Sequence, residues 1–76
     1  MLFSELMDSQ SSIDLAIGAH VIARLCSSNA QFESAAKFFR VAMESFQHLI
    51  RTIGAETLQV FYLLTSYYYS LILPEE

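Results

Sequence analysis

The sequence predicts an all-α fold of antiparallel helices, and three segments lead to this prediction. The clearest is 31–53, whose apolar residues recur at intervals of three and four, the period of a helix with one buried face. Residues 13–28 repeat this pattern with a wider apolar face, and 57–73 is apolar on two sides and carries no charge. Because a strand cannot use a spacing of three and four, we expect helices throughout.

The helix expected over 31–53 has an apolar side and a charged side. Its charged residues lie opposite the apolar stripe, and two pairs of opposite charge are four residues apart, the distance at which helical side chains meet: Glu33 with Lys37, and Arg40 with Glu44. At about 1.5 Å per residue this helix is about 34 Å long. Gly54 follows it directly, where a helix stop is expected.

Two helical segments are expected before this central helix. Residues 2–8 favour a short helical turn, and the polar residues that follow predict a break. Ser11 or Ser12 can then cap a second helix over 13–28 by accepting a hydrogen bond from a free backbone amide. Since 27–30 is too short a link for any other arrangement, the second helix and the central helix should be antiparallel neighbours.

The last helix is expected over 56–73 and is ended by Pro74. Its apolar residues form one stripe that the central helix can cover, and a second stripe that needs another neighbour: Val60, Leu63, Tyr67 and Leu71. No further segment of this sequence supplies that neighbour. We therefore expect a fragment of a longer helical array, or a chain that self-associates through its last helix.

Composition points to protein partners and away from nucleic acid. Hydrophobic residues make up 54% of the 76 residues and charged ones 16%, against roughly 45 to 50% and 25% in ordinary soluble domains. Such an excess of apolar surface needs a cover. The formal net charge of −4 opposes the phosphate neutralisation on which nucleic-acid binding depends, so we expect no nucleic-acid partner.

The expected location is the cytoplasm. Cys26 is the single cysteine, so no internal disulfide is possible, and this fits a reducing compartment. The N-terminal residues carry Glu5 and Asp8 and lack the basic region of a secretory signal. Residues 57–73 reach only the lower limit for a membrane span and include several polar side chains, so we expect a core helix rather than a membrane anchor.

Residues 13–53 resemble a tetratricopeptide repeat, a helix-turn-helix unit with large and small residues at fixed offsets. The run I22-A-R-L-C26 followed by Ala30, Phe32, Ala35, Phe39 and Ala42 is similar to the family's pattern in order and spacing. Ala30 and Cys26 stand where the family has glycine and tyrosine. The long second helix followed by I-G-A-E-T-L is similar to the 42-residue variant of kinesin light chains, so the resemblance implies a fragment of an α-solenoid.

The resemblance also implies close contact at small residues and a peptide-binding groove. Ala23, Ala35 and Ala42 would let paired helices approach, with Ile22, Phe32 and Phe39 filling the space beside them. In the family the first helices of the repeats line the groove, which here gives these residues: Ile17, His20, Arg24, Ser27, Gln59, Tyr62, Ser66 and Tyr69.

In that groove Arg24 would hold a partner carboxylate, and Tyr62 or Tyr69 would stack or hydrogen-bond. The alternative is that these polar stripes simply meet water. We expect no catalysis, because no base is placed to activate Cys26, which should be a small core residue.

We expect no cofactor and no metal. Glu44 and His48 are four apart, but in a hairpin turning near residue 29, His20 lies opposite about residue 39 and far from His48. Two other functions stay open. The chain is also similar to the helical C-terminal region of MYND–SET methyltransferases, and a small protein anchored in a membrane through 57–73 is the second alternative.

Overall fold

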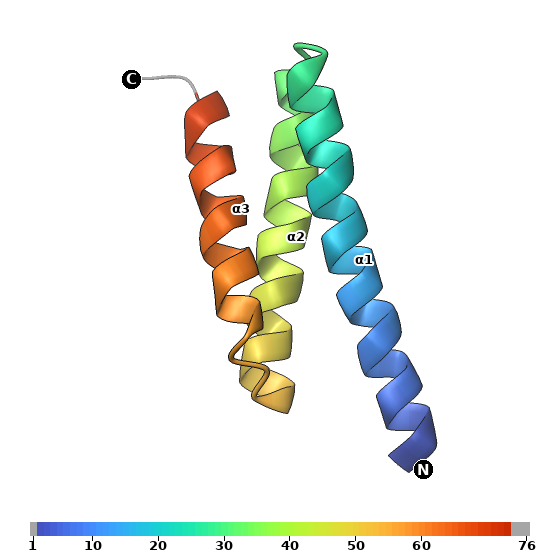
Figure 1. Cartoon of the computed structure of the whole chain (residues 1–76). Coiled ribbons are helices and arrows are strands. Elements are labelled where there is room, and N and C mark those ends of the chain that lie inside the picture. Colours follow the sequence, from blue (N-terminus) through green and yellow to red (C-terminus); the bar gives the residue numbers. More distant parts are fainter. Residues whose placement is uncertain (1, 74–76) are drawn as a thin grey trace.

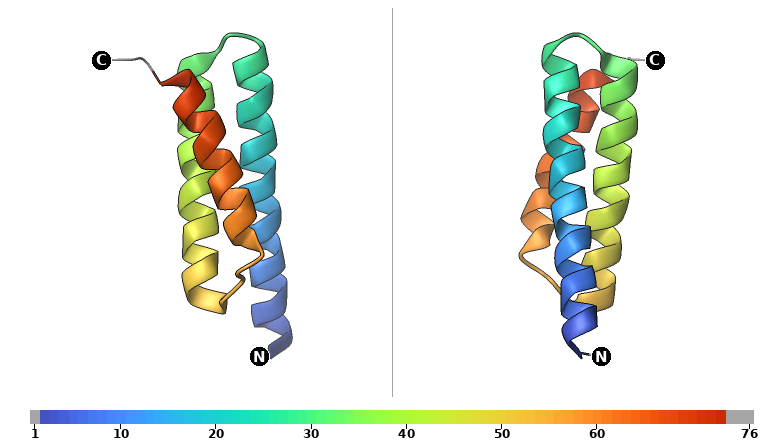
Figure 2. Two further views of the ribbon diagram at one scale, coloured as in Figure 1. Left: turned by 60° about the vertical axis from the view of Figure 1, so that its left-hand side comes forward. Right: turned by 90° about the vertical axis from the view of Figure 1, so that its right-hand side faces the viewer.

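The protein consists of three helices in a computed structural model that describes residues 2–73, with side chains from residue 12 onward. Helix α1 spans Leu2–Ser28, α2 spans Phe32–Ile53 and α3 spans Leu58–Ile72. No strand occurs among the described residues, and the all-α prediction is confirmed. Helices α1 and α2 run antiparallel side by side, and α3 returns along them in the direction of α1 (Figures 1 and 2). The bundle is elongated, with extents of 46 × 19 × 15 Å.

Helix α1 corrects the prediction for the N-terminus. The separate turn over 2–8 and the break after it are wrong, because one helix runs unbroken from Leu2 to Ser28. Residues 11 and 12 therefore lie inside a helix and not at its start. Polar residues such as these cost at most about 0.7 kcal/mol each in a helix interior. Stopping and restarting a helix would require a second, costly nucleation step.

A hydrogen-bonded cap joins α1 to α2. The amide of Gln31 donates to the carbonyl of Cys26 at 2.8 Å, and the amide of Ala30 donates to the carbonyl of Ser27 at 3.1 Å. This pair of bonds is a Schellman motif, which requires its penultimate residue to be left-handed. Ala30 meets the requirement with a φ of 60°, at a position where glycine would carry no steric cost.

The turn between α2 and α3 agrees with the sequence. Gly54 adopts the left-handed conformation, with φ of 65°, directly after α2, as its role as a helix stop predicted. Helix α3 begins two residues later than predicted, because Ala55 accepts a hydrogen bond from the amide of Leu58 at 3.0 Å in a separate turn. Leu73 is extended, with ψ of 137°, as expected for a residue before proline; Pro74 itself lies outside the described residues.

The core is a seam of alanine and phenylalanine between α1 and α2, closed by α3. Ala23, Ala35 and Ala42 are fully buried, as the resemblance implied, and so is Phe39. The buried residues form two clusters along the seam: Ala16, Ala19, Ala42, Phe46, Leu49 and Leu58 in one, and Ala23, Ala35 and Phe39 in the other.

Two residues expected to fill this seam do not enter it. Ile22 is 44% exposed and Phe32 is 50% exposed. Ile22 lines, together with Ala19, a groove on the side of the hairpin that none of the described helices covers. Cys26 is half-buried against the cluster around Phe39 and is a free thiol.

Helix α3 covers one side of the hairpin and leaves its own far side open. Leu58 and Thr65 are buried, whereas the stripe for which the sequence offers no neighbour is exposed at 58 to 68%: Val60, Leu63, Tyr67 and Leu71. We call these four side chains the outer stripe. None of the helices that residues 2–73 form has both the length and the apolar character needed to cross a membrane.

Candidate functional site

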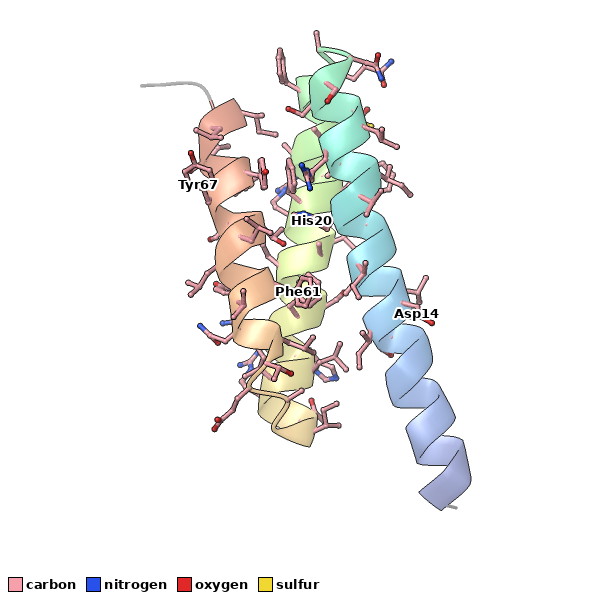
Figure 3. The ribbon with its side chains drawn as sticks, in the orientation of Figure 1. Asp14, His20, Phe61 and Tyr67 are labelled. Atoms are coloured by element: carbon pink, nitrogen blue, oxygen red, sulfur yellow. The ribbon has the colours of Figure 1, made fainter. Side chains whose placement is uncertain are left out.

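The predicted groove between α1 and α3 is closed at its centre by His20. The side chain of His20 is only 6% exposed, and its Nδ1 lies 2.9 Å from Oγ1 of Thr65 on α3. In Figure 3 His20 sits between the helices rather than on the surface. His20, predicted to line a partner-binding surface, is therefore buried, because α3 covers the stripe on which it lies.

The hydrogen bonds around Thr65 determine which nitrogen of His20 carries its proton. The Thr65 hydroxyl donates to the carbonyl of Phe61 at 2.7 Å, and a hydroxyl has only one proton to give. His20 must therefore donate from Nδ1 to Oγ1 of Thr65. Burial of the ring, and then the nearby charge of Arg24, lower the pKa of His20 below its usual value. His20 is thus a neutral residue that ties α1 to α3.

Three aromatic rings, one from each helix, surround this bond. The His20 ring meets Phe39 of α2 edge-on, with centroids 5.9 Å apart, and meets Tyr68 of α3 in the same way at 5.8 Å. The contact with Phe39 confirms the hairpin register, which placed residue 20 opposite residue 39. Phe39 and Tyr68 are parallel, with centroids 6.3 Å apart. The rings make a rigid platform just below the surface of the bundle.

Arg24 lies on this platform. Its guanidinium carbon is 4.7 Å from the centroid of the Tyr68 ring, a cation–π contact that fixes the position of an otherwise exposed side chain. Within residues 12–73, no carboxylate forms an ion pair with Arg24. The structure therefore presents a positioned positive charge between α1 and α3 that no carboxylate of residues 12–73 compensates.

Two hollows flank Arg24, and their linings differ. One has a volume of about 140 Å³ and is lined by Arg24, hydroxyl groups and two aromatic rings: Ser27, Ser28, Phe39 and Tyr68. The other has a volume of about 220 Å³, and its further lining is mostly aliphatic: Val21, Leu25 and Ser28. We call the first the polar hollow and the second the aliphatic hollow. A polar pocket beside an apolar one is suited to a carboxylate with a hydrophobic neighbour.

The remaining predicted residues are divided between surface and core. Arg24 and Ser27 come together at the polar hollow. Gln59 is exposed, and Ser66 is half-buried. The two tyrosines serve mainly in packing, because Tyr62 packs against the cluster around Phe46, and Tyr69 packs against the cluster around Phe39.

Tyr68 is not among the candidate site residues that the sequence predicts. The residue is half-buried and contributes its ring to both His20 and Arg24. The signal for it is the parallel course of α1 and α3, since His20 pairs with a residue 45 positions later. A separation of about 45 residues from Arg24 leads to the tyrosine run 67–69, and the structure shows that Tyr68 is the one beneath Arg24.

Neither the composition of the clusters nor the comparisons assign a chemistry to the protein. Among the described residues, no three side chains of His, Cys, Asp and Glu gather as a metal ion would require. Comparison of the chain with known protein families, curated proteins and solved structures finds no match.

Proposed function

We propose that the protein is a non-catalytic interaction module that binds a peptide or helix of a partner protein between α1 and α3. The observation that carries this proposal is Arg24, held over the Tyr68 ring with no carboxylate partner among residues 12–73. A positioned cation without a counter-ion is a binding group for an anionic side chain or a chain terminus. Such a site recognises a partner by charge and shape and performs no reaction.

The two hollows define what the partner offers. A carboxylate in the polar hollow meets the guanidinium of Arg24 and is close to the hydroxyl groups of Ser27 and Ser28. An aliphatic side chain next to that carboxylate fits the hollow between Val21 and Leu25. Because stacking on Tyr68 already restricts Arg24, less conformational entropy is lost on binding.

The tetratricopeptide-like architecture is part of this proposal. The antiparallel pair α1 and α2, followed by α3 running parallel to α1, is the order of a first repeat and the opening helix of the next (Figure 1). Fully buried alanines at the crossing support it as well. The cytoplasm is the proposed location, on the evidence of one free thiol at Cys26.

Binding of peptides selected from a random library tests the function. Peptides displayed with free carboxyl termini are selected on the wild-type chain, and their affinities are measured by fluorescence anisotropy. We expect selected sequences to place a carboxylate beside an aliphatic residue. Because a hydrogen bond to a charged group contributes about 1.5–3 kcal/mol, Arg24→Gln should weaken binding at least about tenfold.

Arg40→Gln is the matched control, since Arg40 is an exposed arginine on the charged side of α2. It removes the same charge from the same chain but should leave peptide affinity unchanged. If no peptide is selected, or if selected peptides bind equally well to Arg24→Gln, the proposed function is wrong.

A further inference from the structure

A second apolar surface lies on the side of the hairpin that α3 leaves open. A groove of about 400 Å³ runs between α1 and α2 and is lined almost entirely by small and apolar residues: Asp14, Leu15, Gly18, Ala19, Ile22, Phe38, Val41 and Ser45. We call it the α1/α2 groove. Gly18 and Ala19 leave room at one wall, and a Cβ atom added at Gly18 would meet nothing within 4 Å. The groove therefore has room at Gly18 for side chains of another helix.

The outer stripe of α3 has the complementary form. It is a ridge of exposed side chains, Val60, Leu63, Tyr67 and Leu71, on a helix that contains no charged residue. The α1/α2 groove has a single charged lining residue, Asp14. Contact between ridge and groove would thus bury very little charge, which is the main electrostatic cost of an interface.

The exposed side of α2 lacks this match. It carries Lys37, Arg40 and Glu44 around Val41. Insertion of that side into an apolar groove would remove three charges from water, which is energetically costly. The uncovered face of α3 therefore suits the groove better than the exposed side of α2 does.

We infer that the protein assembles head to tail, with the outer stripe of α3 from one copy in the α1/α2 groove of the next. This inference goes beyond the proposed function and does not use Arg24. In Figure 3 Asp14 lies on the outer flank of α1 and Tyr67 on the outer flank of α3, at opposite sides of the bundle. A contact between opposite sides does not close into a two-fold dimer but continues into a ring or an open chain of copies.

The exposed area matches what such a contact needs. A fully exposed aliphatic side chain offers about 60–120 Å² and an aromatic one about 200 Å², so ridge and groove together expose about 600 Å² of apolar surface. Apolar atoms make up about 60% of an interface, which brings the total to about 1,000 Å². This is the lower limit for a specific contact, so assembly should be weak and dependent on concentration.

Sedimentation velocity of three purified chains tests the inference. Gly18→Glu places a charge in the groove at an open position of α1, and it replaces glycine by a better helix former, so the fold should be retained. Leu63→Glu places the same charge on the exposed outer stripe. Gln47→Glu is the control on an exposed position of α2. Circular dichroism verifies that all three variants are helical.

The wild type and Gln47→Glu should show an average mass that rises with concentration past twice the 8.6 kDa of one chain. Each of the other variants alone should remain a monomer. A mixture of Gly18→Glu and Leu63→Glu should form a one-to-one pair and nothing larger, because one intact stripe and one intact groove remain between them.

Three results would overturn the inference. These are a wild type that stays monomeric at every concentration, a closed dimer that persists in Gly18→Glu, and a mixture of the two variants that does not associate. The failure of this experiment would leave peptide binding at Arg24 intact, since that test uses another surface and another variant.

Discussion

His20 and Thr65 join α1 to α3 through one buried hydrogen bond, 2.9 Å from Nδ1 to Oγ1. Helix α3 otherwise packs mainly against α2, so this bond helps to set where α3 lies relative to α1. Tyr68 follows Thr65 by three residues on α3, so the same alignment of α3 with α1 places the Tyr68 ring. The Tyr68 ring in turn positions Arg24. His20, which the sequence led us to expect at a partner, is instead buried and helps to position Arg24, the residue that we propose binds one.

Replacement of Thr65 by valine should destabilise the protein by about 1–3 kcal/mol, because a buried donor on His20 then lacks its acceptor. Valine has nearly the same shape as threonine, so packing around the site is preserved. The free energy of unfolding, measured in urea by circular dichroism, checks the loss. Thr65→Ser keeps the hydroxyl and should lose less.

The double variant His20→Leu with Thr65→Val separates the hydrogen bond from packing. Removal of both polar groups leaves no unsatisfied atom, so the double variant should be more stable than the sum of the two single losses predicts. Strictly additive losses would show that the two side chains are not coupled and that the bond contributes nothing specific.

Stability should fall as the pH is lowered through the usual pKa of histidine, about 6.5. Because the folded protein holds the pKa of His20 below that value, the unfolded chain takes up a proton first. The unfolded state then binds more protons, and stability rises with pH in that window. Above it both states have neutral His20 and the effect vanishes. Urea midpoints between pH 5.5 and about pH 7.5 measure the slope.

His20→Gln removes the titrating group but keeps a donor toward Thr65, so it should flatten this slope. His48→Gln is the control, since His48 is exposed on α2. An unchanged slope in His20→Gln would mean that other groups cause the pH dependence.

Ala30→Gly should stabilise the protein by about 1 kcal/mol, although glycine weakens most helices. Ala30 has a φ of 60°, a conformation that costs alanine about 1–2 kcal/mol and glycine very little. Thermal unfolding should show a higher Tm. The same exchange inside a helix, Ala36→Gly in α2, should lower the stability by about 1 kcal/mol. Equal signs for the two variants would contradict the left-handed geometry of Ala30.

Tyr68→Leu should weaken the binding of any peptide that depends on Arg24 by about two- to fivefold, because an exposed cation–π contact contributes about 0.5–1 kcal/mol. Tyr68→Phe keeps an aromatic face beneath the guanidinium and should bind close to normally. Anisotropy titrations with one selected peptide measure both. If leucine and phenylalanine give the same affinity, the ring does not position Arg24.

Local features of this fold could be predicted from the sequence, because they depend on neighbouring residues. The stop at Gly54 and the burial of Ala35 and Ala42 follow from turn chemistry and helical period. The exposure of Leu63 could be predicted because the last helix has two apolar stripes and the sequence offers a neighbouring helix for only one of them. The break after residue 8 was wrong because small differences in helix propensity do not interrupt a helix that is already growing.

The candidate site depends on contacts between residues that are far apart in the sequence. The polar stripe of α1 contains both His20 and Arg24, and periodicity alone gives them the same exposure. Which of them faces solvent depends on where α3 lies, and that is set by packing between residues 45 positions apart. The role of Tyr68 depends on the same packing, so only the structure reveals it.

The most direct test of peptide binding at Arg24 is an NMR titration of the isotope-labelled chain with a selected peptide. We predict saturable shifts that are largest at the amides of Arg24, Ser27, Ser28 and Tyr68 and at the Nε–H of Arg24, and that disappear in Arg24→Gln. Shifts confined to the charged side of α2, or shifts that persist unchanged in Arg24→Gln, would contradict the account.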